Sequence, residues 1–163
     1  MAGYMFIKLG DNIKGESTDE DYKEQIEMLN FSWGLSQPTS AVSGTGGRTG
    51  AAPNFSDFSF MKVVDAASPD IYLHCAQGTH IPKVEIAVLQ SAGDNRNPYL
   101  KYELEDVIIA NCQISGSAGG EKAAESVSLN YGKCKQIYTP ISQTGEAGSA
   151  TERGWNLETN KKM

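Results

Sequence analysis

The stretch from Leu29 to Ser36 constrains the fold most, because large apolar and small polar side chains alternate along it without a break. This period of two is typical of a β-strand with one buried face, whereas a helical face repeats every ~3.6 residues. The apolar positions are Leu29, Phe31, Trp33 and Leu35. The polar positions are Asn30, Ser32, Gly34 and Ser36. We therefore expect the apolar side chains to fill a core and the polar ones to form a nearly smooth surface.

Similar alternation recurs along most of the chain and predicts further strands. We expect strands at residues 4–9, 13–17, 55–64, 83–90, 99–104, 107–114 and 124–138. Residues 153–156 are expected either to add a closing strand or to dock on the barrel. A bulge is expected at Glu105–Asp106, between two of these segments. About eight strands with regular turn signals indicate a mainly β fold, either a sandwich or a closed antiparallel barrel.

One helix is predicted, from Ser68 to the glycine at position 78. Ser68 is expected to be the N-cap, Pro69 suits the first turn, and Asp70 is favourable to the helix dipole. Gly78 is a natural terminating residue, because glycine adopts the left-handed conformation without strain.

The segment 38–54 is rich in Gly, Ser, Thr and Ala, and we expect a long extended loop there. Its 44–50 portion, Gly-Thr-Gly-Gly-Arg-Thr-Gly, has the glycines of a phosphate-binding loop. It lacks the Gly-Lys-Ser/Thr that such a loop needs before a helix, so nucleotide binding is not favoured.

Composition excludes several classes of partner. The chain has 163 residues, a net charge of −6 and a pI of 4.9. Nucleic acid is not an expected partner, since phosphate neutralisation needs a basic surface. The first apolar run is too short for a signal peptide, and no segment approaches the ~18 apolar residues of a membrane span. We expect synthesis in the cytoplasm, and any export to use a route that reads no N-terminal signal.

No residue set points to catalysis, a metal or a cofactor. Cys75, Cys112 and Cys134 are widely spaced and are expected to be free thiols. His74 and His80 lack a third ligand at metal-binding spacing, so we interpret them as surface or helix-end histidines. The acidic run at 16–27 could hold a carboxylate pair, but a solvated loop is favoured because nothing apolar nearby would raise a pKa.

Several motifs, in order along nearly the whole chain, resemble those of the haemolysin-coregulated protein family, Hcp. They are Phe-Ile-Lys at 6–8, Ile-Lys-Gly-Glu-Ser at 13–17, Phe-Ser-Trp-Gly-Leu-Ser-Gln at 31–37, Phe-Ser-Phe-Met-Lys at 58–62, Gly-Thr-His-Ile-Pro at 78–82, Glu-Ser-Val-Ser-Leu-Asn-Tyr at 125–131 and Gly-Trp-Asn at 154–156. This family forms the inner tube of the bacterial type VI secretion system.

The resemblance implies a single tube domain over residues 1–163, with an antiparallel β-barrel of two sheets, one flanking helix and a phage-tail-tube-like architecture. It implies hexameric rings that stack into a tube, partners in the contractile sheath and the spike protein, and small effector proteins held in the ring. It also implies secretion through the type VI apparatus without a signal peptide.

The resemblance also assigns residues. It implies that Ser32 faces the lumen and contacts effectors, together with its polar neighbours Asn30, Gly34 and Ser36. The polar face of the strand around 127–131 is expected to share that lining. The loop 38–54 is implied to contact neighbouring subunits and rings. Within it we expect contacts from Thr39, Gly44, Gly47, Arg48 and Thr49.

Two other functions are compatible with a chain of this length. A serine hydrolase using His74 or His80 is not favoured, because no Gly-x-Ser-x-Gly elbow occurs and Ser117 lies in a Gly/Ser loop. The alternative to a tube subunit is a monomeric β-barrel binding module.

Overall fold

The protein was analysed as a computed structural model, which describes residues 4–39, 50–92 and 95–163. The expected loop contacts Gly44, Gly47, Arg48 and Thr49 lie outside the described residues. The described strands and the one described helix follow in chain order. They are β1 (Tyr4–Leu9), β2 (Ile26–Glu27), β3 (Asn30–Ser32), β4 (Leu35–Ser36), β5 (Asn54–Phe55), β6 (Phe58–Val63), α1 (Ser68–Gln77), β7 (Ile81–Ala92), β8 (Asn95–Ser115), β9 (Ala124–Tyr138), β10 (Thr151–Asn156) and β11 (Lys161–Lys162).

The fold is mainly β and antiparallel, as predicted. One sheet has the order β11-β10-β9-β8-β7-β1-β2, and β3 and β6 join it because β6 also pairs with β9. A separate ribbon is formed by β4 and β5. The three predicted elements 4–9, 124–138 and the single helix all form. Residues 153–156 belong to a strand, β10, which pairs with β9 and β11.

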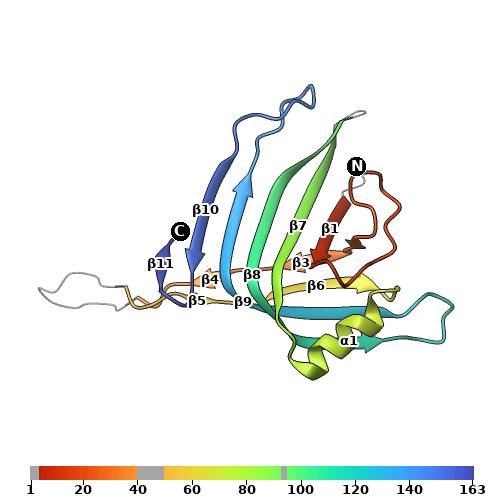
Figure 1. Cartoon of the computed structure of the whole chain (residues 1–163). Helices are drawn as coiled ribbons and strands as arrows, with labels where there is room; N and C mark the ends of the chain where they lie inside the picture. Colours follow the sequence, from red (N-terminus) through yellow and green to blue (C-terminus); the bar gives the residue numbers. More distant parts are fainter. Residues whose placement is uncertain (1–3, 40–49, 93–94) are drawn as a thin grey trace, which may run out of the picture.

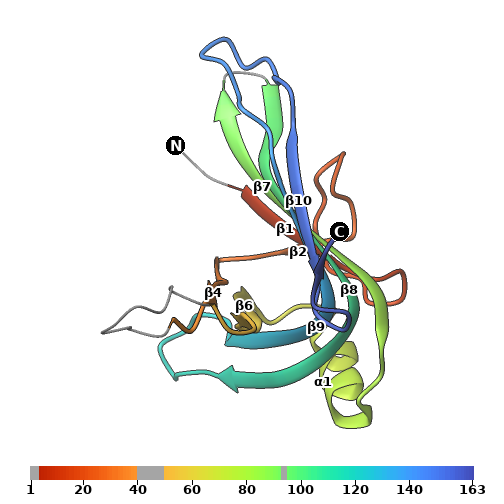
Figure 2. The same cartoon turned by 90° about the vertical axis from the view of Figure 1, so that its left-hand side faces the viewer.

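Two long strands, β8 and β9, bend and divide the large sheet into two parts (Figure 1). In the upper sheet, residues 95–107 of β8 pair with β7, and residues 133–138 of β9 pair with β10. In the lower sheet, residues 108–115 of β8 pair only with β9, whose residues 124–129 also pair with β6. The lower sheet therefore has the order β3-β6-β9-β8. Figure 2 shows the lower strands running across the foot of the upper ones.

The bend is made where Asp106 lies opposite Gly132. Asp106 has a φ of 52°, in the left-handed region, and both Leu104 and Val107 are buried, so the buried face of β8 changes here. Pairing is nevertheless kept on both sides, from Glu105 with Lys133 to Val107 with Tyr131. At Glu105–Asp106, where a bulge was predicted, the buried side of β8 switches but the pairing register does not shift. The register shift occurs further along the strand, between Ile109 and Asn111. A Cβ at position 132 would lie 3.3 Å from that of Asp106, which explains the glycine.

The predicted continuous strand from Leu29 to Leu35 is wrong, because the chain leaves the lower sheet at Gly34. The Gly34 N–H donates to Ser56 Oγ (3.0 Å), and its carbonyl accepts from the Ser56 N–H (2.9 Å). The following residues pair with β5 instead of β6. Leu29 and Leu35 are each 55% exposed, contrary to expectation, whereas Phe31 and Trp33 are partly buried against the core.

The barrel that we expected is not closed by a β-ladder among the described residues. Instead, one segment crosses from one sheet edge to another. The Met28 N–H donates to the Met5 carbonyl of β1 (2.8 Å), and the Leu29 N–H donates to the Met61 carbonyl of β6 (2.7 Å). The predicted strand at 13–17 is also wrong: it makes a single bridge, between Leu9 and Ile13, within a loop folded on itself.

The core lies between the two parts of the sheet and under α1. Its fully buried members include Phe58, Phe60, Ile71, Leu104, Val127 and Leu129. Aromatic rings fill the angle of the bend, where Trp33 lies 5.2 Å from Tyr102 between ring centroids and Phe31 lies 5.6 Å from Phe58. The helix ends at Gly78 with a φ of 65°, as predicted.

Candidate functional site: the polar face of the lower sheet

Small polar side chains cover the side of the lower sheet that points away from the core. We call this surface the serine face. Its polar residues include Asn30, Ser32, Ser59, Asn111, Gln113, Ser126, Ser128 and Asn130. Strand register sets these residues in rows, because side chains at paired positions point to the same side of a sheet. Ser32 pairs with Ser59, Ser59 with Ser128, and Ser128 with Asn111, so one row crosses all four strands.

Hydrogen bonds within the serine face join neighbouring strands. The Ser59 and Ser128 hydroxyls lie 3.0 Å apart, and Asn130 Nδ2 donates to Asp57 Oδ1 (3.0 Å). None of the eight residues is ionisable. These eight residues therefore offer uncharged hydroxyl and amide groups, and the Asp57 carboxylate beside them is hydrogen-bonded to Asn130.

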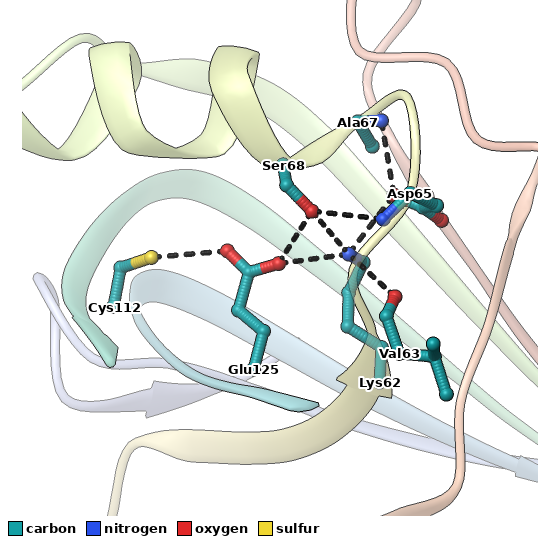
Figure 3. Close-up of polar contacts among 7 residues, drawn as sticks. All are labelled: Lys62, Val63, Asp65, Ala67, Ser68, Cys112 and Glu125. Carbon is teal, nitrogen blue, oxygen red and sulfur yellow. Dashed lines mark hydrogen bonds and ion pairs between the residues drawn. The ribbon is translucent and has the colours of Figure 1, made fainter. Parts of the chain in front are cut away.

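Behind the serine face, on the core side, lies a buried ionic network (Figure 3). Lys62 of β6 and Glu125 of β9 are paired across the strands, and each is 0% exposed. Lys62 Nζ donates to Glu125 Oε2 (2.8 Å) and to Ser68 Oγ (3.0 Å), and lies 2.9 Å from Asp65 Oδ1. The Ser68 hydroxyl donates to Glu125 Oε2 (2.7 Å), and Cys112 Sγ donates to Glu125 Oε1 (3.1 Å). The network thus joins the first turn of α1 to both strands.

This network explains why the predicted N-cap is wrong. Ser68 lies inside the helix, Ala67 occupies the cap position, and no side chain caps it. The Ser68 hydroxyl accepts from Lys62 and from the Asp65 N–H (3.1 Å) instead. A serine before a helical pattern is normally a capping signal, and here a buried lysine binds its hydroxyl.

Charge in the network is compensated. Burial by itself raises the pKa of Glu125, but hydrogen bonds from Lys62, Cys112 and Ser68 outweigh burial and lower that pKa below its ordinary value. The pKa of Cys112 is raised to about 12, first by burial and then by the adjacent Glu125 carboxylate. The Cys112 thiol is therefore protonated at neutral pH and is a poor nucleophile. All three cysteines are free, as expected.

Of the expected lumen residues, the structure brings only Asn30 and Ser32 together on the serine face. Gly34 is bonded to Ser56, and Ser36 lies in the β4–β5 ribbon opposite Asn54. In the expected contact loop, Thr39 makes a bridge with Gly50, after β4 and before β5 in the chain. The polar side of β9 lies on the serine face, together with β6 and β8 residues that we did not single out. The alternation at 57–63 indicates that Ser59 lies on the polar side of its strand. For Asn111 and Gln113, the bulge after Ile109 shifts the alternation, so the sequence pattern does not indicate on which side they lie.

The histidines and the acidic run lie elsewhere. His80 Nδ1 is 2.6 Å from Asp106 Oδ1 at the bend, and His74 Nδ1 is 2.8 Å from the Asp70 carbonyl within α1. Among residues 4–39, 50–92 and 95–163, no three His, Cys, Asp or Glu side chains come together as metal ligands.

The acidic run is held more firmly than a solvated loop. Tyr22 stacks on Phe6 with ring centroids 4.6 Å apart, and Asp19 forms an ion pair with Arg96 at 2.6 Å. No helix in the described part of the chain combines the length and apolarity needed to cross a membrane.

Comparison with known proteins identifies the family. The family model described as "Type VI secretion system effector, Hcp" matches residues 6–138. The chain belongs to the Hcp family. It is 36% identical over 161 residues to protein hcp1 of Pseudomonas aeruginosa, which covers 98% of each chain.

Solved Hcp structures share the fold. The structure described as that of a type six secretion system protein matches with a TM-score of 0.93 at 34% identity, over 99% of this chain and 100% of the other. Hcp1 of Salmonella typhimurium matches with a TM-score of 0.81 at 32% identity, over 100% of both chains. The mainly β antiparallel architecture and the type VI resemblance are thereby confirmed.

Proposed function

We propose that this Hcp chain is a structural subunit of the type VI tube, which forms hexameric rings and holds effector proteins against the serine face in the ring lumen. One observation carries the proposal: the lower sheet has an unpaired edge at each end. Among the described residues, β3 pairs only with β6, and β8 beyond Val107 pairs only with β9. Unpaired edges present free backbone N–H and C=O groups that readily accept another strand.

The two edges suit a cyclic assembly. A ring needs a heterologous interface, in which one surface binds a different surface of the neighbour. The lower sheet has an even number of strands, all antiparallel, so β8 of one copy can meet β3 of the next in antiparallel sense around the whole ring. Closure would make one continuous wall with the serine faces on a common side. This arrangement buries the edges that a monomer would leave open.

Assembly can be tested directly. We expect the purified protein to elute as a hexamer from size-exclusion chromatography with light scattering, and to appear as rings in negative-stain images. A variant carrying Lys135→Ala, on the upper sheet and away from both edges, should give the same rings. Compact monomers at micromolar concentration would support the alternative, a monomeric binding module, and contradict the ring.

Effector binding can be tested at Ser32, which the family resemblance assigns to it. We expect Ser32→Gln to leave rings intact and to reduce the effector that co-purifies with tagged rings from cells with an active type VI system. The larger side chain projects from the serine face, where it displaces contacts. Ser117→Gln adds the same side chain in an exposed loop and is the matched control. Unchanged effector levels in Ser32→Gln rings would remove Ser32 from the site.

The wider assignments belong to the same proposal. The subunit binds further copies of itself, the contractile sheath and the spike protein. It leaves the cell through the type VI apparatus without a signal peptide. A structural role is favoured over a catalytic one, since the buried Lys62, Glu125 and Cys112 are fully engaged with each other. Detection of the protein in culture medium, and its loss on deletion of the sheath, tests the route.

A further inference from the structure

The serine face is not uniform, because its end nearest α1 carries exposed apolar side chains. Met61 and Val63 are 37% and 38% exposed, and they lie on the same side of β6 as Ser59. Leu29, 55% exposed, lies beside them, since its N–H donates to the Met61 carbonyl. We call Leu29, Met61 and Val63 the apolar end. Across the strands Met61 lies between Asn30 and Ser126, so polar groups border it.

A hollow continues from the apolar end toward the acidic loop. Its apolar lining includes Leu29, Val63 and Val64, and its polar lining includes Glu16, Glu27, Asp65 and Lys122. Asp65 is already paired with Lys62. Glu16 and Glu27 are outside the ion pairs formed among the described residues, and Lys122 is the one cationic residue among the described residues that line the hollow. The hollow therefore combines an apolar wall with an excess of negative charge.

The two kinds of surface differ in what they can contribute to binding. Serine and asparagine groups exchange hydrogen bonds with water for hydrogen bonds with a partner, which changes the free energy little. Exposed apolar side chains gain when a partner removes them from water, in proportion to the area covered. Binding energy at interfaces is concentrated in a few such anchors, surrounded by near-neutral contacts. On the serine face, the apolar end is the place where an anchor can form.

We propose that the apolar end is the holding point for cargo, and that the cargo presents an apolar side chain flanked by basic residues. The inference rests on the proposed lumen-binding function and names the chemistry of its partner. The apolar side chain covers Met61 and Val63, and the basic residues face Glu16 and Glu27. The polar remainder of the serine face then contributes little to the choice of cargo protein. Cargo proteins of different shape can therefore share one point of attachment.

The test uses wild-type rings and two labelled synthetic peptides, one alternating leucine with lysine and one alternating leucine with glutamate. Fluorescence anisotropy measures binding. We expect the lysine peptide to bind at least about tenfold more tightly than the glutamate peptide, because opposite charges meet. Met61→Gln combined with Val63→Thr should weaken binding of the lysine peptide about tenfold or more, because the apolar anchor is lost.

Controls separate this site from general attraction to an acidic protein. Leu35→Thr removes an equally exposed apolar side chain from the β4–β5 ribbon and should leave binding unchanged. Glu27→Gln should lower the preference for the lysine peptide severalfold and keep the apolar contribution. All the substituted side chains are exposed, so folding is expected to be retained, with circular dichroism as the check.

Three outcomes overturn the inference. Equal binding of the lysine peptide to wild type and to the Met61/Val63 variant, with rings intact, removes the apolar end as the holding point and leaves the ring proposal standing. Loss of rings in that variant shows that a neighbouring copy covers the apolar end, which again contradicts cargo binding there. A wild-type protein that forms no rings contradicts both proposals together.

Discussion

The upper and lower parts of β8 and β9 make an instructive comparison, since the same two strands build both. On the upper sheet the side away from the core carries a ladder of charges, in which Lys135 lies 3.9 Å from Glu103 and 3.7 Å from Glu152. On the lower sheet the corresponding side carries uncharged serines and amides, and the charges of Lys62 and Glu125 lie buried on the core side. β8 and β9 pair in antiparallel fashion in both parts. The two surfaces therefore differ in whether the charged side chains lie on the side away from the core or on the core side.

This difference fits a division of roles. A charged ladder keeps an outer surface soluble and discourages unwanted contact. An uncharged polar surface can slide past or hold many partners without strong attraction or repulsion. The lower sheet keeps ionisable groups, but on its core side, where Lys62 and Glu125 bond Ser68 of α1. Four substitutions or conditions test whether this contrast is real.

The largest effect is expected from Lys62→Met. Removing the lysine leaves Glu125 ionised and buried without its partner, which should destabilise the fold by about 3–5 kcal/mol. Guanidinium denaturation at a fixed protein concentration measures this. Lys122→Met, at an exposed lysine, is the control. A Lys62→Met/Glu125→Met double variant should recover much of the loss, and a Lys62→Met loss below about 1 kcal/mol would contradict the compensated buried pair.

A smaller loss is expected from Trp33→Ala. Trp33 Nε1–H donates to the Tyr131 hydroxyl, which in turn donates to the Ser56 carbonyl (2.7 Å). Since the indole is only partly buried, we expect about 2–3 kcal/mol, below the ~3–5 typical of a buried tryptophan. Trp33→Phe keeps an aromatic ring but loses the hydrogen bond to Tyr131, and should lower the free energy of unfolding by about 1 kcal/mol. Chemical denaturation separates the two, and equal losses would mean that packing contributes nothing.

Acidification should weaken the lower sheet in a defined direction. Because the pKa of Glu125 is lowered in the folded state, its ionised form contributes stability that is fully present above the ordinary pKa near 4.5. That stability is lost as pH falls through the lower, folded-state pKa. We expect the effect to be smaller again, since protonated Glu125 still forms hydrogen bonds.

Denaturation between neutral and acid pH, on wild type and the Lys62→Met/Glu125→Met variant, measures the contribution. The double variant should lose less stability on acidification. Parallel pH profiles would show that other carboxylates account for acid sensitivity.

The smallest effect is expected on the upper sheet. Lys135→Ala removes two long ion pairs between partly exposed groups and should change stability by less than about 0.5 kcal/mol. Thermal unfolding with and without added salt measures it. If Lys135→Ala were as damaging as Lys62→Met, the contrast between the two parts would fail.

The sequence predicted elements whose cause is local. Alternation at 124–138 matches β9, and Gly78 ends α1, because a strand face and a left-handed turn each leave a direct signal. Alternation did not reveal where the chain changes partner. Leu29 and Leu35 obey the same period as Phe31, but hydrogen bonds from Ser56, distant in sequence, divert the chain at Gly34.

The candidate site was predicted in part for the same reason. Asn30 and Ser32 were found from their own strand, whereas the row that joins Ser32 to Asn111 depends on three pairings and a bulge. The buried network had one signal that was not used. Lys62 falls on the apolar side of its strand with Phe58 and Phe60, and a lysine there requires a buried partner.

The pairing of β8 with β9 on both sides of the bend has a mechanical consequence. Since Glu105 and Val107 keep their partners on both sides of Asp106, β8 and β9 are paired in the same register just before and just after the corner. A load along these strands is shared by many bonds in shear at once, whereas a hairpin pulled open at its end breaks them one by one. The upper and lower sheets are therefore mechanically coupled through β8 and β9, so a force applied to one sheet is transmitted to the other.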